Sequence, residues 1–95
     1  MNARDLFRMK MRGEVAVNIV NTNNRLLKEG LSEKEISHHI TNVFAEEESM
    51  RLHRDYGHDE DGVDIYGDAV HAAVNTYKKY LRLVYICMII FFNHK

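Results

Sequence analysis

The last third of the chain, residues 63–92, carries the feature that most constrains the fold. The chain contains no proline, and no glycine follows Gly67. Apolar and aromatic side chains recur at intervals of three and four residues: Val63, Tyr66, Val70, Ala73, Tyr77, Tyr80, Val84, Cys87 and Phe91. This period is typical of a helix that packs one face against other helices. The sequence therefore predicts one helix over 63–92, about 45 Å long at 1.5 Å per residue.

The end of this predicted helix, residues 83–92, contains no charged side chain. A helix that is apolar all round must be covered on every side. Ile, Val, Tyr and Phe also favour strands, but the unbroken seam favours a helix. Because a bilayer span needs about 20 residues, we expect no transmembrane span and interpret this end as a self-association surface. The predicted oligomer interface comprises Tyr80, Val84, Cys87, Met88, Phe91 and Phe92.

A first helix is predicted over residues 5–28. Its apolar stripe consists of Leu6, Met9, Ala16, Val20 and Leu27, with Val15, Ile19 and Leu26 beside it. Gly13 interrupts the pattern and costs about 1 kcal/mol relative to alanine in a helix interior. At the other end, Gly30 followed by Leu31 predicts a left-handed cap closed by an apolar contact.

A second helix is predicted over residues 33–55. Ser32 with Glu35 three residues later is a capping box at its start. The residues expected to face inward are Ile36, Ile40, Val43, Phe44 and Met50. The acidic run Glu46, Glu47 and Glu48 is expected on its solvent side.

These segments predict a single all-α domain over residues 1–95, a three-helix up-down-up bundle with helices at about 5–28, 33–55 and 63–92. Two helices of about 23 residues cannot cover the whole of the third. Its apolar end would be exposed in a monomer, and contiguous exposed apolar surface usually marks a partner site. We therefore expect the long C-terminal helix to be used for oligomerisation.

Charge is distributed unevenly along the chain. Residues 1–28 carry six basic and two acidic side chains, residues 29–68 three and twelve, and residues 69–95 four and none. Pairing between neighbouring helices explains this pattern, but the acidic middle could also dock a basic protein surface. The residues predicted for such an acidic surface are Glu46, Glu47, Asp59, Glu60 and Asp61. The single cysteine, Cys87, permits no intrachain disulfide, which favours a reducing, cytoplasmic location.

Residues 26–37, LLKEGLSEKEIS, resemble the opening of a helix-turn-helix unit of the response-regulator type, in which a GLS-x-x-EI run begins the first helix. The resemblance implies that a turn and a recognition helix follow. The next segment instead carries Glu46, Glu47 and Glu48, which phosphate would repel. A capped helix start explains the same letters, so we expect no DNA binding.

The loop around residue 60 offers partial cation-binding patterns. Asp59, Asp61, Gly62 and Asp68 match four places of a calcium loop, but Gly57 at the first ligand place has no side chain. A solvated acidic loop and a weak hard-cation site remain the two interpretations.

Residues 64–75, DIYGDAVHAAVN, resemble the acidic helix of the all-α nucleotide pyrophosphohydrolases of the MazG type. The resemblance implies that carboxylates of two helices hold Mg²⁺ on a triphosphate. The corresponding metal ligands here are Glu47, Glu48, Asp64 and Asp68. Ile65 replaces one expected carboxylate, and Met50 and Arg51 stand where another should return. Magnesium needs near-octahedral oxygen ligands, so the acidic motif is incomplete.

Two functions follow from these patterns. The leading hypothesis is a small non-enzymatic helical binding or regulatory protein without a cofactor, which acts through protein–protein contacts as a dimer or higher homo-oligomer. Small, proline-free, cysteine-poor helical proteins are common among phage accessory factors. The alternative is a Mg²⁺-dependent nucleoside triphosphate pyrophosphohydrolase. A third idea, pH-sensitive assembly, rests on the histidines in or beside the acidic segment, His38, His39, His53 and His58.

Overall fold

The computed structural model describes residues 2–57 and 64–93, with side chains as far as Tyr80. Its helices are α1 (Ala3–Lys28), α2 (Glu33–His39), the π-helical η1 (Ile40–Phe44), α3 (Ala45–Tyr56) and α4 (Ile65–Asn93). Because α2, η1 and α3 follow one another without a break, they form one continuous helix. The described ranges contain no strand, so the all-helical prediction is confirmed, including a helical backbone over residues 83–92.

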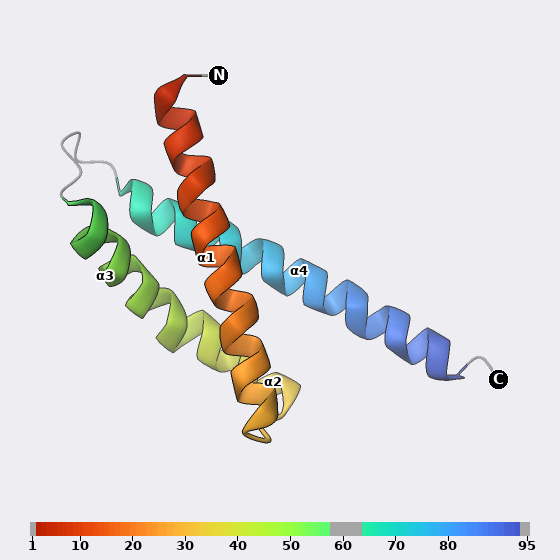
Figure 1. The fold of residues 1–95 in the computed structure, drawn as a ribbon. Helices are drawn as coiled ribbons and strands as arrows, with labels where there is room; N and C mark the ends of the chain where they lie inside the picture. The colour runs from red at the N-terminus through yellow and green to blue at the C-terminus, as the bar shows by residue number, and fades with distance from the viewer. Residues whose placement is uncertain (1, 58–63, 94–95) are drawn as a thin grey trace.

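The helices alternate in direction, as Figure 1 shows. The chain descends along α1, returns along α2, η1 and α3, and then runs along α4 in the general direction of α1. However, α4 crosses α1 obliquely, so that its C-terminal half extends past the other helices. The radius of gyration is 15.5 Å, compared with about 13 Å for a compact domain of 100 residues. The elongation comes from the part of α4 that extends past the other helices.

The turn between α1 and α2 has the predicted chemistry. Gly30 adopts a φ of 91°, its N–H bonds to the carbonyl of Leu27, and the N–H of Leu31 bonds to that of Leu26. This is the Schellman arrangement, which satisfies carbonyls at a helix end. Ser32 and Glu35 then exchange the two hydrogen bonds of a capping box. The turn expected after a helix-turn-helix opening is absent, because the helix continues from Glu33 through Tyr56.

The face of α1 that packs into the core lies beside the apolar stripe found in the sequence. Met11, Val15, Ile19 and Leu26 are buried. The apolar stripe itself is exposed: Leu6, Met9, Ala16, Val20 and Leu27. The helix has apolar side chains on two sides, and helical period alone does not say which side meets the rest of the chain. The core side is the one that carries Val15, Ile19 and Leu26.

The π-helical turn explains the error in the second helix. The buried residues are four apart: Ile36, Ile40, Phe44, Glu48 and Leu52. In a regular α-helix each step of four drifts by about 40° around the axis, but the wider π turn takes up an extra residue and limits that drift. Val43 and Met50, predicted inward, are therefore 43% and 63% exposed, whereas Glu48, predicted outward, is only 7% exposed.

The first half of α4 packs as predicted. Tyr66, Val70 and Ala73 of the seam are buried, together with Ile65, Ala69 and Val74. Asp64 caps the helix, because its Oδ1 accepts a hydrogen bond from the N–H of Gly67 at 2.8 Å. Within the described part of the chain, no helix has both the length and the apolar character that crossing a bilayer requires.

Candidate functional site

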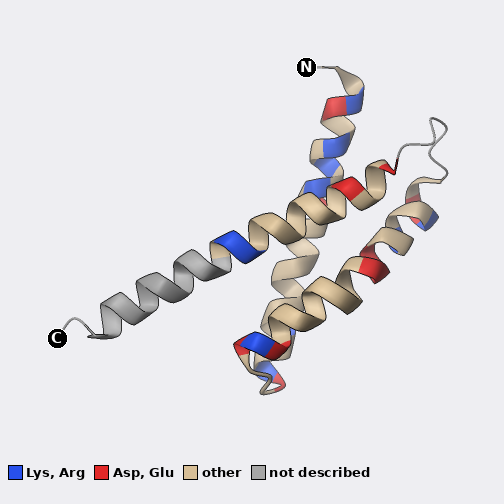
Figure 2. Ribbon diagram, turned by 180° about the vertical axis from the view of Figure 1, so that it is seen from behind, with Lys and Arg blue, Asp and Glu red and all other residues tan. Residues whose placement is uncertain are grey.

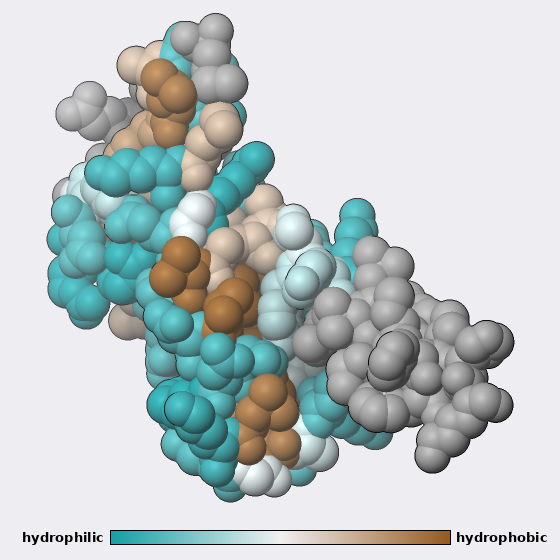
Figure 3. All heavy atoms as spheres, turned by 45° about the vertical axis from the view of Figure 1, so that its right-hand side comes forward, coloured by the Kyte–Doolittle hydropathy of each residue, from teal (hydrophilic) through white to brown (hydrophobic). Residues whose placement is uncertain are grey.

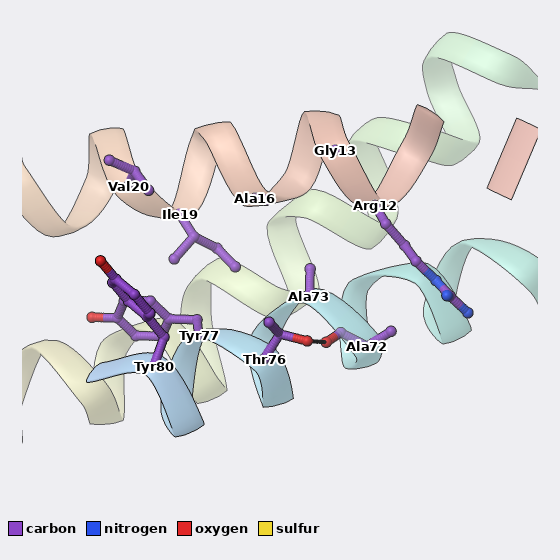
Figure 4. A pocket seen from close by; sticks show the side chains of 10 residues that line it. All are labelled: Arg12, Gly13, Ala16, Ile19, Val20, Ala72, Ala73, Thr76, Tyr77 and Tyr80. Carbon is purple, nitrogen blue, oxygen red and sulfur yellow. Dashed lines mark hydrogen bonds between the residues drawn. The ribbon is translucent and has the colours of Figure 1, made fainter. Parts of the chain in front are cut away.

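An apolar groove of about 410 Å³ lies between α1 and α4. In Figure 4, Arg12 lies at one end of the groove and the rings of Tyr77 and Tyr80 lie together at the other. The full lining consists of Arg12, Gly13, Ala16, Ile19, Val20, Ala72, Ala73, Thr76, Tyr77 and Tyr80. Figure 3 turns this side of the molecule forward and shows apolar side chains in a broken band between polar surfaces.

The groove exists because small side chains meet where the two helices separate after their crossing. Gly13 and Ala16 line it from α1, and Ala72 and Thr76 line it from α4. A Cβ atom added at Gly13 would meet nothing within 4 Å. Larger side chains at these places would fill the space, since helix packing brings neighbouring side chains into close contact. Ile19 and Ala73, both buried, close the inner side of the groove.

The groove belongs to a longer apolar surface on the outer side of α1. Leu6, Met9, Gly13, Ala16, Val20 and Leu27 follow one another at helical spacings of three, four and seven residues. Val20 is 54% exposed, and Leu6, Met9 and Leu27 are similarly open. From Leu6 to Leu27 this outer face is about 32 Å long. An apolar helix face of this length left in water is typical of a partner site.

The opposite side of α1, which faces α3, is closed by polar contacts. The amide of Asn18 donates a 3.0 Å hydrogen bond to Glu48. Arg51 binds both oxygens of Glu48, each at 3.0 Å, and Asp55 at 3.1 Å. These contacts, Glu48 above all, raise the pKa of the Arg51 guanidinium. The buried charge of Glu48 is therefore compensated twice, by a salt bridge and by the amide.

Tyr56 makes a second tie between α1 and α3. Its hydroxyl donates a short hydrogen bond to the carboxylate of Glu14, and this bond raises the pKa of the tyrosine. Its ring packs edge-on against Phe7, with centroids 5.2 Å apart, and the ammonium of Lys10 lies 5.6 Å from its centroid. The contacts of Asn18 with Glu48 and of Glu14 with Tyr56 lie on the other side of α1, so they do not cover the groove.

One tie holds α1 to α4 at the tyrosine end of the groove. The hydroxyl of Tyr77 donates a 2.6 Å hydrogen bond to Asn23. Burial raises the pKa of Tyr77, and the negative charge of Glu33 adds to the effect. At the other end, Arg12 also lines a hollow of about 40 Å³ that it shares with Arg8 and Asp68. The groove therefore has an anchored aromatic end and a basic end.

The predicted oligomer interface is described only in part. Tyr80 is 66% exposed at the end of the groove. The side chains of the remaining members lie outside the described residues: Val84, Cys87, Met88, Phe91 and Phe92. For these five positions the interface stays a prediction, on a backbone that is helical.

The four carboxylates of the magnesium alternative each have different surroundings. Glu48 is held by Asn18 and Arg51, and Glu47 is exposed. Asp64 caps α4 and lies 3.8 Å from Nε2 of His53, while Asp68 lines the hollow with the arginines of α1. Among the described residues, no group of three or more His, Cys, Asp or Glu side chains is arranged to hold a metal ion.

The predicted acidic surface is present in its first part. Glu46 and Glu47 are exposed in the first turn of α3, and Asp59, Glu60 and Asp61 lie outside the described residues. Glu46 also lines a polar hollow of about 360 Å³ between α3 and α4, which includes Asp64 and His71. Figure 2 colours the ribbon by charge and shows acidic positions on α3 and basic positions along α1.

Sequence reasoning missed the groove residues Arg12, Gly13, Ala72 and Thr76 as candidates. The signal available in the sequence was the presence of two apolar stripes on one helix, since a two-layer packing can bury only one of them. A scan against protein-family models finds no match, and neither curated proteins nor solved structures show a similar chain. The class that fold and site define is thus an all-helical protein with an open apolar groove.

Proposed function

We propose that this chain is a small non-enzymatic helical binding protein that acts through protein–protein contacts and associates with itself. The groove between α1 and α4 carries the proposal, because it joins an exposed apolar face that runs along most of α1. The apolar sequence of residues 83–92 continues α4 beyond the groove, and it supplies further surface for the same contact.

The shape of this surface favours a protein partner over a small molecule. Small-molecule sites bury most of the ligand in a concave pocket with a few convergent polar groups. Here the apolar surface runs on past the groove to Leu6 and Leu27, and the lining offers few polar groups. A helix laid into a groove uses apolar residues at spacings of three, four and seven, which is the spacing of this outer face.

The surroundings of Glu48 support a non-enzymatic role. A carboxylate that is to bind magnesium must offer its oxygens to the ion. Both oxygens of Glu48 already accept hydrogen bonds from Arg51, and one of them also from Asn18.

The test is the molar mass of the full-length protein in solution, measured by size-exclusion chromatography with light scattering. We expect a multiple of the 11.2 kDa chain mass. Val20→Glu should shift the mass toward the monomer, because it places a charge in the groove. Asn21→Glu is the matched control: it adds the same charge to the next residue, about 100° around the helix, and should leave the mass unchanged. A stable monomer at high concentration would contradict self-association.

A further inference from the structure

The groove is lined by residues of two basic helices, and this restricts what can occupy it. α1 carries six Lys or Arg side chains and two carboxylates, a net charge of +4. Arg12 lines the groove, and Lys79 lies one turn beyond Thr76 on α4, on the same side of that helix. No carboxylate is among the residues that line the groove within the described part of the chain. A second α1 laid against this face would bring another +4, so charge favours an occupant that carries both apolar and acidic side chains.

The same chain presents such a surface on η1 and α3. Val43 and Met50 are exposed, and they are seven residues, or about 10 Å, apart. Glu46 and Glu47 are exposed between them. We call these four residues the ridge. Its length equals the distance along α1 from Gly13 to Val20, the part of α1 that lines the groove beyond Arg12.

We propose that the ridge of one copy docks in the groove of a second copy, with Val43 and Met50 against the small residues and Glu46 and Glu47 toward Arg12 and Lys79. This inference rests on the self-association proposed above and names the surfaces that make it. The ridge and the groove are on different helices of one folded chain, and the ridge cannot reach the groove of its own chain. The contact therefore joins two chains. Such a contact is heterologous: it builds rings or filaments, or a dimer when two such contacts close on a two-fold axis.

Two variants separate the surfaces. The groove variant, Ala16→Glu with Val20→Glu, blocks the groove and keeps the ridge. The ridge variant, Val43→Glu with Met50→Glu, removes the apolar ridge and keeps the groove. All four positions are exposed, so we expect both variants to fold, which circular dichroism and thermal unfolding check. Using glutamate in both prevents attraction between a mutant ridge and a mutant groove.

Light scattering on each variant alone and on an equimolar mixture is the test. Each variant alone should be a monomer of about 11 kDa, and the mixture should form a 1:1 heterodimer of twice that mass through the one intact groove and the one intact ridge. The heterodimer should weaken as salt is raised, because salt screens the contact between acidic and basic side chains.

The outcomes distinguish this inference from the proposed function. A ridge variant that still assembles like the unmodified protein would overturn the ridge and leave self-association standing. If both variants are monomeric and do not combine, the ridge-to-groove contact is also overturned. The mixture holds one intact ridge and one intact groove, which such a contact would join. A monomeric unmodified protein would overturn the inference and the proposed function together.

Discussion

The two sides of α1 both carry apolar side chains, but only one of them is buried in the fold. Toward the core, large apolar residues such as Met11 and Val15 are buried, and hydrogen bonds of Asn18 and Glu14 join α1 to α3. Toward the outer side, Gly13 and Ala16 leave a groove, and Val20 remains in water. One side is complete within a single chain and the other is not. The comparison teaches that a small domain can bury only one apolar side of such a helix, which leaves the other side for the contact proposed above.

The largest expected effect comes from breaking the completed side. Glu48→Ala removes a buried carboxylate that holds Arg51 and Asn18, and leaves an arginine with a single remaining partner on this helix. We expect a loss of about 2–3 kcal/mol in the free energy of unfolding, measured by urea denaturation. Glu47→Ala, at the neighbouring exposed position, is the control and should change stability by less than about 0.5 kcal/mol.

On the groove side of α1, a substitution is expected to increase the stability of the fold. Gly13→Ala should stabilise the fold by about 1 kcal/mol, because alanine is the better helix former and its Cβ meets open space. Urea denaturation of the variant in a Val20→Glu background removes any contribution from association. A destabilised Gly13→Ala would mean that the glycine meets a constraint in the folded chain that the open groove does not provide.

The hydrogen bond between Tyr56 and Glu14 predicts that the stability of the fold depends on pH in the alkaline range. The folded-state pKa of Tyr56 is raised above 10.0 by its hydrogen bond to Glu14. Its contribution to stability is therefore fully present below pH 10 and is lost as the pH rises through the folded-state pKa. Absorbance titration of the tyrosines should show a late-titrating group, beside that of Tyr77, that Tyr56→Phe removes. The variant should lose less stability above pH 10 than the unmodified chain. Tyr80→Phe, at an exposed ring, is the control.

The smallest expected effect is that of magnesium. Because Arg51 and Asn18 occupy the oxygens of Glu48, we expect millimolar Mg²⁺ to leave the melting temperature unchanged. A rise in melting temperature that Glu47→Ala and Asp64→Ala abolish would instead favour the metal-binding alternative.

The sequence predicts the helices and their caps well, because these depend on neighbouring residues. Ser32 and Glu35 form the capping box that their spacing indicates, and the three helices fall within two residues of the predicted bounds. Local chemistry of this kind does not depend on the rest of the chain. The fold class could therefore be derived without a structure.

The faces of the helices could not be derived in the same way. On α1, the stripes of Val20 and Val15 are both apolar, and only the positions of the other helices decide which is buried. On the second helix, the extra residue in η1 turns Met50 outward and Glu48 inward, and no residue type in Ile40–Phe44 marks a π turn. The groove was missed for the same reason, since its lining is contributed by two helices whose crossing is set by tertiary packing.

Because the wide turn of η1 holds one extra residue, it decides which face of the helix beyond it meets the core. If the same residues closed into regular α-helix, everything from Ala45 to Tyr56 would rotate by about 100° about the axis, whereas deleting one residue between Ile40 and Phe44 at the same time would cancel that rotation. Without the deletion, the carboxylate of Glu48 would point away from α1, and Met50 would leave the outer surface. A one-residue deletion in this stretch should therefore remove the π turn and leave the orientation of α3 unchanged.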